Sequence, residues 1–151
     1  MRIALVVSSY HDFVTTRLEA GARDVLLRAG LADADIATFS VPGAYELAQA
    51  ASRIAHTGDW QGIVCLGCLI RGETPHFDYI ARAAADGIMR VAQDTGVPVT
   101  FGVLTTNTAE EALARAGEGA TNKGREAAAA VLEMVALYAR FGRKRPEGDA
   151  P

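Results

Sequence analysis

The pattern of apolar and polar positions divides the chain into alternating strands and helices. The clearest example is GIVCLGCLIRGETPHFDYI, residues 62–80, whose first half is almost entirely apolar. Such a run is typical of a parallel strand buried on both faces. It breaks at an Arg-Gly pair, after which Thr74 and Pro75 have the pattern of an N-cap followed by the first residue of a helix. We therefore expect a strand, a tight turn and a helix that carries His76 in its first turn.

The rest of the chain repeats this alternation. Three further apolar runs predict strands, at residues 2–8, 36–41 and 97–104. The other helical segments are predicted at residues 13–29, 44–55, 108–115 and 123–141, with a stop signal at Gly30 and a capping box from Thr108 to Glu111. Four strands that alternate with helices over short connections indicate an α/β fold. We expect a single-domain three-layer α/β/α sandwich with a four-stranded parallel sheet.

Length and composition narrow the class of protein. A chain of 151 residues suits one domain, which we place at residues 1–141, with GRKRPEGDAP at 142–151 as a disordered tail. Fifteen Lys and Arg against 18 Asp and Glu give a net charge of −3, which argues against nucleic-acid binding and against a polybasic membrane anchor. The opening run RIALVVSS is too short to span a bilayer and lacks a signal-peptide cleavage pattern. We expect a cytoplasmic protein that binds small molecules or further copies of itself.

Cys65 and Cys68 form a C-x-x-C pattern, which could indicate a redox or metal site. On a strand, however, an odd separation places the two side chains on opposite faces, with Cα atoms roughly 10 Å apart and too distant for a disulfide. The sequence has no second Cys pair, and its three histidines lie in separate segments. We interpret both cysteines as small apolar strand residues and expect no metal site.

The last predicted helix carries little charge. After its first turn the charged residues are Glu126, Glu133 and Arg140, seven positions apart on one narrow stripe. One face of a sheet cannot cover the apolar remainder of the helix. We favour burial in a subunit interface, and a thin Ala-rich helix that needs little cover is the alternative.

The residues that follow the predicted strands are candidates for a binding site, because ligands of parallel sheets bind beyond the carboxyl ends of the strands. These candidates are Tyr10, residues 43–46, residues 68–76 and residues 101–106, with Arg115 and Lys123 beside the next loop. Together they suit a flat polar ring and a phosphate, which can bind at a helix start. His76 stands beside that helix start and is the histidine placed to move protons near neutral pH. We assign no functional role to His11, His56 or Trp60.

Four motifs, in this order and spacing, resemble the 6,7-dimethyl-8-ribityllumazine synthase family. They are VPGAYEL at 41–47, LIRGETPHFDYIA at 69–81, FGVLTTNT at 101–108, and RAG with NKG at 115–117 and 122–124. The resemblance covers residues 2–141 and implies a flavodoxin-like strand order. It implies a transferase that condenses 5-amino-6-(D-ribitylamino)uracil with 3,4-dihydroxy-2-butanone 4-phosphate, the penultimate step of riboflavin biosynthesis. Phosphate and water are lost, and no cofactor is used.

The resemblance also implies a role for each matched residue. His76 transfers protons, Tyr10 stacks on the pyrimidine where the family usually has Phe, and Phe101 covers the ring from a neighbouring subunit. The other pyrimidine and ribityl contacts are Ala44, Tyr45, Glu46, Cys68, Leu69, Ile70 and Lys123, and the phosphate contacts are Glu73, Thr74 and Arg115. Many members have a second cation in the loop after Arg115, where this chain has GEGAT at 117–121. We therefore expect a weaker hold on the phosphate.

The resemblance further implies an assembly built from pentamers and riboflavin synthase as a partner. The sequence starts close to its first strand and leaves no room for the N-terminal segment of shell-forming members, which favours a free pentamer. The alternative function is a non-catalytic flavin or lumazine carrier, or a shell protein, on the same scaffold. Such a protein would not need both His76 and Arg115. Taken singly, Arg115 and Lys123 would be solvated charges, and Tyr10 and Phe101 would be core or rim aromatics.

Overall fold

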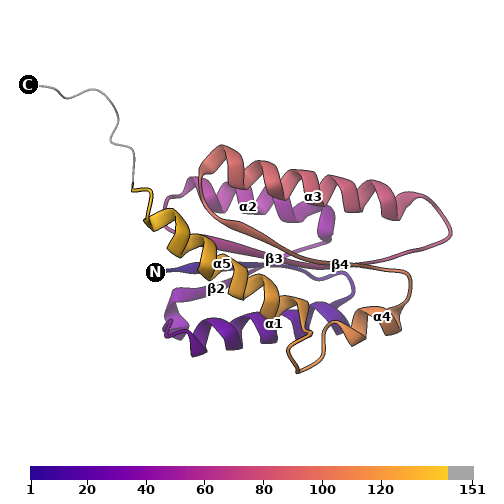
Figure 1. Ribbon diagram of the computed structural model, residues 1–151. Helices are drawn as coiled ribbons and strands as arrows, with labels where there is room; N and C mark the ends of the chain where they lie inside the picture. The colour runs from indigo at the N-terminus through magenta and orange to yellow at the C-terminus, as the bar shows by residue number, and fades with distance from the viewer. Residues whose placement is uncertain (143–151) are drawn as a thin grey trace, which may run out of the picture.

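Four strands and five α-helices alternate along residues 1–142, the part of the chain that the computed structural model describes (Figure 1). In chain order they are β1 (Ile3–Ser8), α1 (Asp12–Arg28), β2 (Ile36–Val41), α2 (Leu47–His56), β3 (Gly62–Ile70), α3 (His76–Thr95), β4 (Val99–Thr106), α4 (Ala109–Ala114) and α5 (Lys123–Ala139). Two short 3-10 turns, η1 (Asp33–Asp35) and η2 (Ala44–Glu46), precede β2 and α2. Of the tail predicted at 142–151, all but Gly142 lies outside the described residues.

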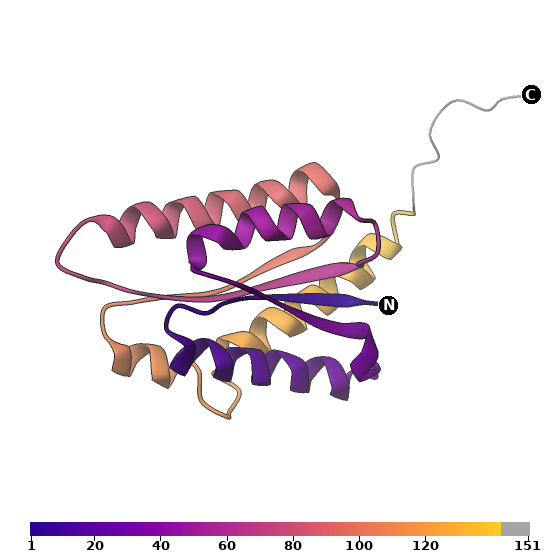
Figure 2. The same ribbon diagram turned by 180° about the vertical axis from the view of Figure 1, so that it is seen from behind.

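The sheet has the order β2-β1-β3-β4, and every pair of neighbouring strands is parallel. Helices α2 and α3 cover one face, and α1, α4 and α5 cover the other, as the two opposite views show (Figures 1 and 2). Side chains alternate along β1, so that Ile3 and Leu5 join the core under α1 and α5 while Ala4 and Val6 join the core under α2 and α3. The predicted three-layer α/β/α sandwich with a parallel sheet and flavodoxin-like strand order is confirmed.

The two cysteines follow the same alternation. Cys65 belongs to the core on the α2 and α3 side, whereas Cys68 belongs to the opposite core, and both thiols are free. Burial raises the pKa of Cys65 to about 12 and that of Cys68 to about 11, which keeps both thiols protonated near neutral pH. Their predicted positions on opposite faces are confirmed. Within residues 1–142, no group of three or more His, Cys, Asp or Glu side chains is placed to hold a metal ion.

Several predicted boundaries are wrong by one to three residues. Strand β4 starts at Val99 and ends at Thr106, two residues later than predicted, because Pro98 has no N–H and the ladder with β3 starts after it. Helix α3 starts at His76, with Pro75 rather than Thr74 at the N-cap and no side-chain cap. The segment predicted as a helix from 44 begins with the 3-10 turn η2, and α5 ends at Ala139 rather than at 141.

The predicted capping box at α4 is half confirmed. Thr108 Oγ1 accepts a hydrogen bond from the backbone N–H of Glu111 at 3.1 Å. The Glu111 carboxylate, however, accepts from the N–H of Asn107 at 3.0 Å instead of returning to the N–H of Thr108. The reciprocal contact therefore reaches one residue further back and fixes the chain where β4 leaves the sheet.

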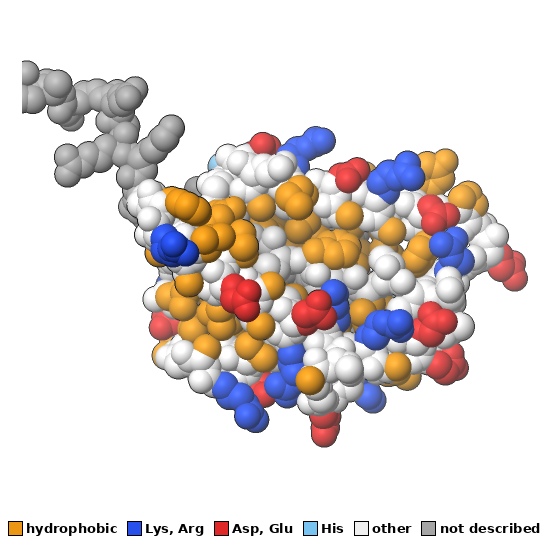
Figure 3. Space-filling view, viewed as in Figure 1, with side chains coloured by type: hydrophobic (Ala, Val, Ile, Leu, Met, Phe, Trp, Pro, Cys, Tyr) orange, Lys and Arg blue, Asp and Glu red, His pale blue; other side chains and the backbone are white. Residues whose placement is uncertain are grey.

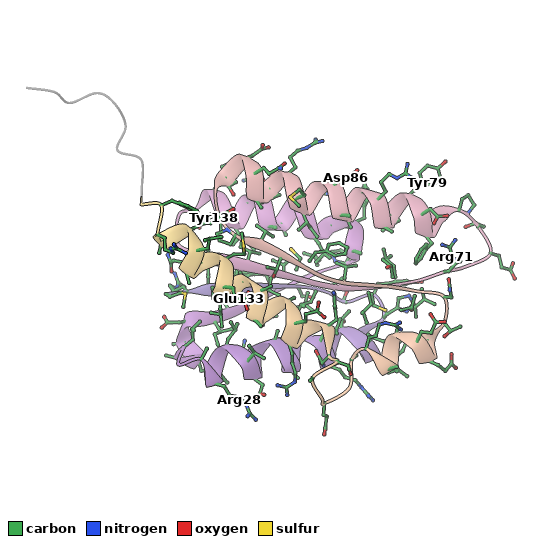
Figure 4. The ribbon with its side chains drawn as sticks, viewed as in Figure 1. Arg28, Arg71, Tyr79, Asp86, Glu133 and Tyr138 are labelled. Atoms are coloured by element: carbon green, nitrogen blue, oxygen red, sulfur yellow. The ribbon has the colours of Figure 1, made fainter. Side chains whose placement is uncertain are left out.

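Helix α5 combines an exposed charge stripe with exposed apolar surface. Glu126, Glu133 and Arg140 are all exposed, as the spacing predicts. Near the end of the helix, Leu137 and Tyr138 are 36% and 38% exposed, and Phe141 just beyond it is 75% exposed. Figure 3 shows hydrophobic side chains gathered around this part of the surface, and Figure 4 labels Glu133 and Tyr138 along α5. No helix within residues 1–142 has the length and apolar character needed to cross a bilayer.

Candidate active site

The carboxyl ends of β1, β2 and β3 and the start of α3 surround a cleft of about 690 Å³, here called the first cleft. It exists at this edge because parallel strands end together there. Beyond the strand ladder, Ser9 N–H donates to Val41 C=O at 2.8 Å and Tyr10 N–H donates to Pro42 C=O at 3.0 Å. These bonds fix the two chain segments that form one side. The lining residues are Tyr10, His11, Pro42, Gly43, Ala44, Tyr45, Glu46, Leu69, Ile70, Gly72, Thr74, His76, Phe77 and Ile80.

Aromatic rings and one carboxylate form the side of the first cleft near β1 and η2. Tyr10 is 66% exposed, so its ring offers an open face on which a flat ligand can stack. Glu46 lies in the η2 turn, which its N–H closes by donating to Gly43 C=O at 3.2 Å. The Glu46 carboxylate lies near the Gly43 backbone, where a Cβ would be 3.8 Å from Oε1. This side of the first cleft can therefore bind a flat ring and accept hydrogen bonds from it.

The opposite side of the first cleft is the exposed turn from β3 into α3. The first N–H groups of a helix have no intrahelical partner, so the start of α3 at His76 presents donors and the positive end of the helix dipole. This arrangement suits an anion.

Arg71 fastens this turn to its surroundings. Its N–H donates to Thr106 C=O at 2.8 Å, and its guanidinium donates to Asn107 Oδ1 at 3.2 Å and to Asp78 at 3.3 Å. The same guanidinium lies over the Phe77 ring, 4.6 Å from its centroid. Figure 4 shows Arg71 at this end of the sheet. Arg71 therefore connects the turn that suits an anion to both β4 and α3.

A second cleft, of about 740 Å³, lies along β4 and the facing parts of α4 and α5. Phe101 is 36% exposed there. Arg115 ends α4, where its Nη1 donates to Glu111 C=O at 3.1 Å, and Lys123 begins α5 with its Nζ 3.1 Å from Glu126 Oε1. The lining residues are Phe101, Val103, Leu104, Thr105, Thr106, Glu111, Ala114, Arg115, Thr121, Lys123 and Glu126. This second cleft can therefore present two cations and an aromatic ring to a ligand.

The structure divides the sequence-predicted site residues between these two clefts. The first cleft contains Tyr10, Ala44, Tyr45, Glu46, Leu69, Ile70, Thr74 and His76, and the second contains Phe101, Arg115 and Lys123. Cys68 is 2% exposed beneath the surface, and Glu73 is exposed in the turn beside the first cleft without lining it. Among the described residues, none lines both clefts. A single chain therefore does not bring all the matched residues together.

His11 lines the first cleft, although sequence reasoning assigned it no role. Its backbone is in the left-handed region at φ 60°, an uncommon conformation outside glycine. The imidazole lies between two aromatic rings, with centroids 4.4 Å from Tyr10 and 5.8 Å from Phe13. Partial burial lowers its pKa. The available signal was its position directly after Tyr10, at the end of a strand.

The other two residues left without a role lie outside both clefts. His56 Nδ1 is 2.6 Å from Ser52 C=O on α2, and Trp60 is 9% exposed beneath the guanidinium of Arg2.

Comparison with known proteins agrees with the motif resemblance. The sequence model of 6,7-dimethyl-8-ribityllumazine synthase matches residues 1–139. The synthase of that name from Salinibacter ruber is 49% identical over 140 residues, which are 93% of this chain and 90% of that protein. Those from Chlorobium phaeobacteroides and Desulfatibacillum aliphaticivorans are 49% and 45% identical over the same shares. The chain therefore belongs to the 6,7-dimethyl-8-ribityllumazine synthase family.

Proposed function

We propose that the chain condenses 5-amino-6-(D-ribitylamino)uracil with 3,4-dihydroxy-2-butanone 4-phosphate, and that each active site combines the first cleft of one subunit with the second cleft of the next. Family membership supports the reaction and the class, a transferase of riboflavin biosynthesis. The division of the matched residues between two clefts with no common lining residue among those described supports the sharing. The expected products are 6,7-dimethyl-8-ribityllumazine, phosphate and water.

The first cleft would bind the pyrimidine and move protons. Tyr10 offers a face for stacking, and Glu46 accepts hydrogen bonds from the ring and the ribityl chain. Ala44, Tyr45, Leu69 and Ile70 surround the same ligand, and Cys68 supports it from below. The amine attacks the ketone, the carbinolamine loses water, phosphate is eliminated, and the ring closes with loss of a second water, so the sequence needs groups that donate and accept protons. His76 lines the cleft at the helix start and would serve that purpose.

The phosphate would lie where the two clefts meet. The Glu73 and Thr74 segment with the start of α3 supplies backbone donors, and the neighbour's Arg115 supplies a planar fork of N–H groups. The neighbour's Phe101 would cover the ring, and the neighbour's Lys123 would lie near the ribityl group. Much of the rate enhancement would come from holding two substrates in register. A non-catalytic carrier is not favoured, because it has no need for a proton-transfer residue opposite a phosphate-binding cation.

An oligomer is also expected from the surface. The exposed apolar side chains of α5 and the outer edge of β4, which pairs with no strand within residues 1–142, offer a face for a second copy of the chain. Within the proposal this assembly is a pentamer or a multiple of pentamers in the cytoplasm, with riboflavin synthase as its partner. Light scattering of the purified protein measures the number of subunits in the assembly directly.

Reassembly of two inactive variants tests the sharing. Chains carrying His76→Ala and chains carrying Arg115→Ala are unfolded, mixed in equal amounts and refolded together. Random mixing in a ring leaves about a quarter of interfaces with an intact first cleft facing an intact second cleft. We expect the mixture to be clearly more active than either variant refolded alone.

The matched control mixes His76→Ala with Tyr10→Ala chains, which both damage the first cleft and can rebuild no intact site. If the first mixture is no more active than the average of its two variants, with mixing confirmed by mass spectrometry, sharing is wrong. The reaction itself is followed by lumazine absorbance after both substrates are added to wild-type protein, and a carrier would give no signal.

A further inference from the structure

We infer that Asn122 is a positioning residue that fixes Arg115 and Lys123 in the second cleft. Asn122 itself lines neither cleft and would not contact the proposed substrates. The inference rests on the proposed function, because it concerns how those two cations are presented to the phosphate and the ribityl chain. Asn122 is the one amide among the buried polar side chains of residues 1–142, and it is 2% exposed. A buried amide is costly unless its hydrogen bonds are made, so its partners indicate what it holds in place.

The Asn122 side chain joins three segments. Its Nδ2 donates to Arg17 C=O on α1 at 3.2 Å and to Gly117 C=O in the loop at 2.8 Å. Its Oδ1 accepts from the N–H of Arg125 at 3.1 Å and so caps α5. Both amide protons are therefore used on backbone carbonyls, one of them 105 positions away in the sequence. The single side chain fastens the loop and the start of α5 to α1.

Two glycines allow this close approach. At Gly21 on α1, a Cβ would lie 2.5 Å from Asn122 Oδ1 and 2.9 Å from Nδ2. At Gly124 on α5, a Cβ would overlap the backbone carbonyl of Leu18 on α1. Real Cβ atoms do not tolerate such distances, so the start of α5 reaches α1 only because both positions lack a side chain. The space that Asn122 occupies is therefore formed by both α1 and α5.

The bonds of Asn122 act on the loop that separates the two cations. Lys123 N–H donates to Arg115 C=O at 2.8 Å and closes the loop at its base. The Asn122 N–H donates to Gly119 C=O at 3.2 Å, and its side chain holds Gly117 C=O. Arg125 adds a tie between the start of α5 and α1, because its Nη1 lies 2.6 Å from Asp24 Oδ2. Asn122 differs in that its bond to Gly117 C=O acts on the loop itself, so it helps to fix the positions of both cations.

The composition of the loop makes this placement matter. Residues 116–121 carry no cation, and their one charged residue is Glu118. Arg115 is therefore the single cation of that loop region placed to meet a phosphate, and no neighbour in the loop compensates for a shift of its guanidinium. Displacement of a binding group by about 1 Å can weaken an interaction by a large factor.

The test compares two ways of disturbing Asn122 with two matched controls. Asn122→Asp keeps an acceptor for the α5 cap but loses both amide donors, and Gly21→Ala pushes on the same side chain from α1 without altering the loop. Gly119→Ala adds a methyl group in the same loop where nothing lies within 4 Å, and Thr57→Ala removes a side-chain hydrogen bond at the end of α2, away from both clefts. We expect the first two variants to raise the KM for the butanone phosphate about fivefold to tenfold, with a smaller effect on kcat. The two controls should stay within about twofold of wild type.

A merely structural role gives a different result. Loss of folded protein lowers the apparent kcat but leaves the KM for each substrate of the surviving enzyme unchanged. An unchanged KM for the butanone phosphate in both Asn122→Asp and Gly21→Ala, while Arg115→Ala raises it, overturns the inference and leaves the proposed function intact. If Arg115→Ala itself leaves that KM unchanged, the phosphate assignment fails instead. In that case hydrogen exchange of the backbone amides of residues 116–121 tests whether Asn122 holds the loop in place. Asn122→Asp must speed this exchange, and Gly119→Ala must not.

Discussion

The first and second clefts present complementary chemistry and are built in different ways. Three neighbouring strands and a helix start enclose the first cleft, so its geometry follows from the order of the parallel sheet. The second cleft uses one edge strand, a six-residue helix and a loop, and it depends on single polar contacts such as those of Asn122. Sheet topology can therefore place aromatic rings and a histidine without special contacts, whereas the two cations need a dedicated buried side chain.

The clefts should also differ in what their loss does to the reaction. The first contains His76, the group suited to proton transfer, and its removal should act on the chemical step. The second contains Arg115 and Lys123, whose removal should act on binding of the charged or polyhydroxyl parts of the substrates. Separate measurements of kcat and of each KM therefore distinguish them.

Replacement of His76 by Ala should have the largest effect. General acid–base groups contribute about 10²–10⁴ in rate, and we expect the lower end or less because the amine is already a competent nucleophile. The pyrimidine KM should change little. Steady-state kinetics measures both quantities, with His56→Ala, outside both clefts, as the control. An unchanged kcat would show that His76 only occupies space in the first cleft.

Replacement of Arg115 by Ala should come next. A charge-assisted hydrogen bond to phosphate contributes roughly 1.5–3 kcal/mol, which corresponds to a rise of about tenfold or more in the KM for the butanone phosphate. The pyrimidine KM should stay near the wild-type value. Arg53→Ala, an exposed change on α2, controls for loss of a positive charge. Equal weakening of both substrates would contradict the division of labour between the clefts.

The Tyr10 ring should contribute less, and to the pyrimidine alone. Aromatic stacking is worth about 0.5–1.5 kcal/mol, so Tyr10→Ala should raise the pyrimidine KM by roughly tenfold at most. Tyr10→Phe keeps the ring and should resemble wild type. Titration of the pyrimidine, followed by its absorbance, measures the effect without turnover. Weaker binding in Tyr10→Phe would indicate that the hydroxyl rather than the ring face makes the contact.

The smallest expected effect concerns pH and His11. Partial burial lowers its pKa in the folded chain, so the unfolded chain binds the proton more readily. Stability should therefore be greatest above about pH 6.5, the ordinary histidine pKa, and fall as the pH drops through and below it. His11→Asn tolerates the left-handed backbone and should flatten this dependence. Urea midpoints at pH 8 and pH 5.5 measure it, and equal slopes in both proteins would exclude His11 as the source.

Local pattern was enough for much of the fold. The buried run of β3, the parity of Cys65 and Cys68, and the cap at Thr108 follow from rules that act over a few residues, and each is confirmed. The errors also have local causes. The late start of β4 is caused by Pro98. The start of α3 depends on whether Thr74 or Pro75 is the N-cap, and the sequence does not distinguish these two positions clearly.

The sequence by itself determined the strands, the face that each side chain takes, and the motifs that identify the family, because these depend on periodicity and residue type. Only the tertiary structure decided the shapes of the two clefts and that His11 lines the first of them. It also decided that Asn122 is buried, since its partner Arg17 lies 105 positions earlier. Contacts between distant segments depend on how helices pack on the sheet, and no local pattern encodes that packing.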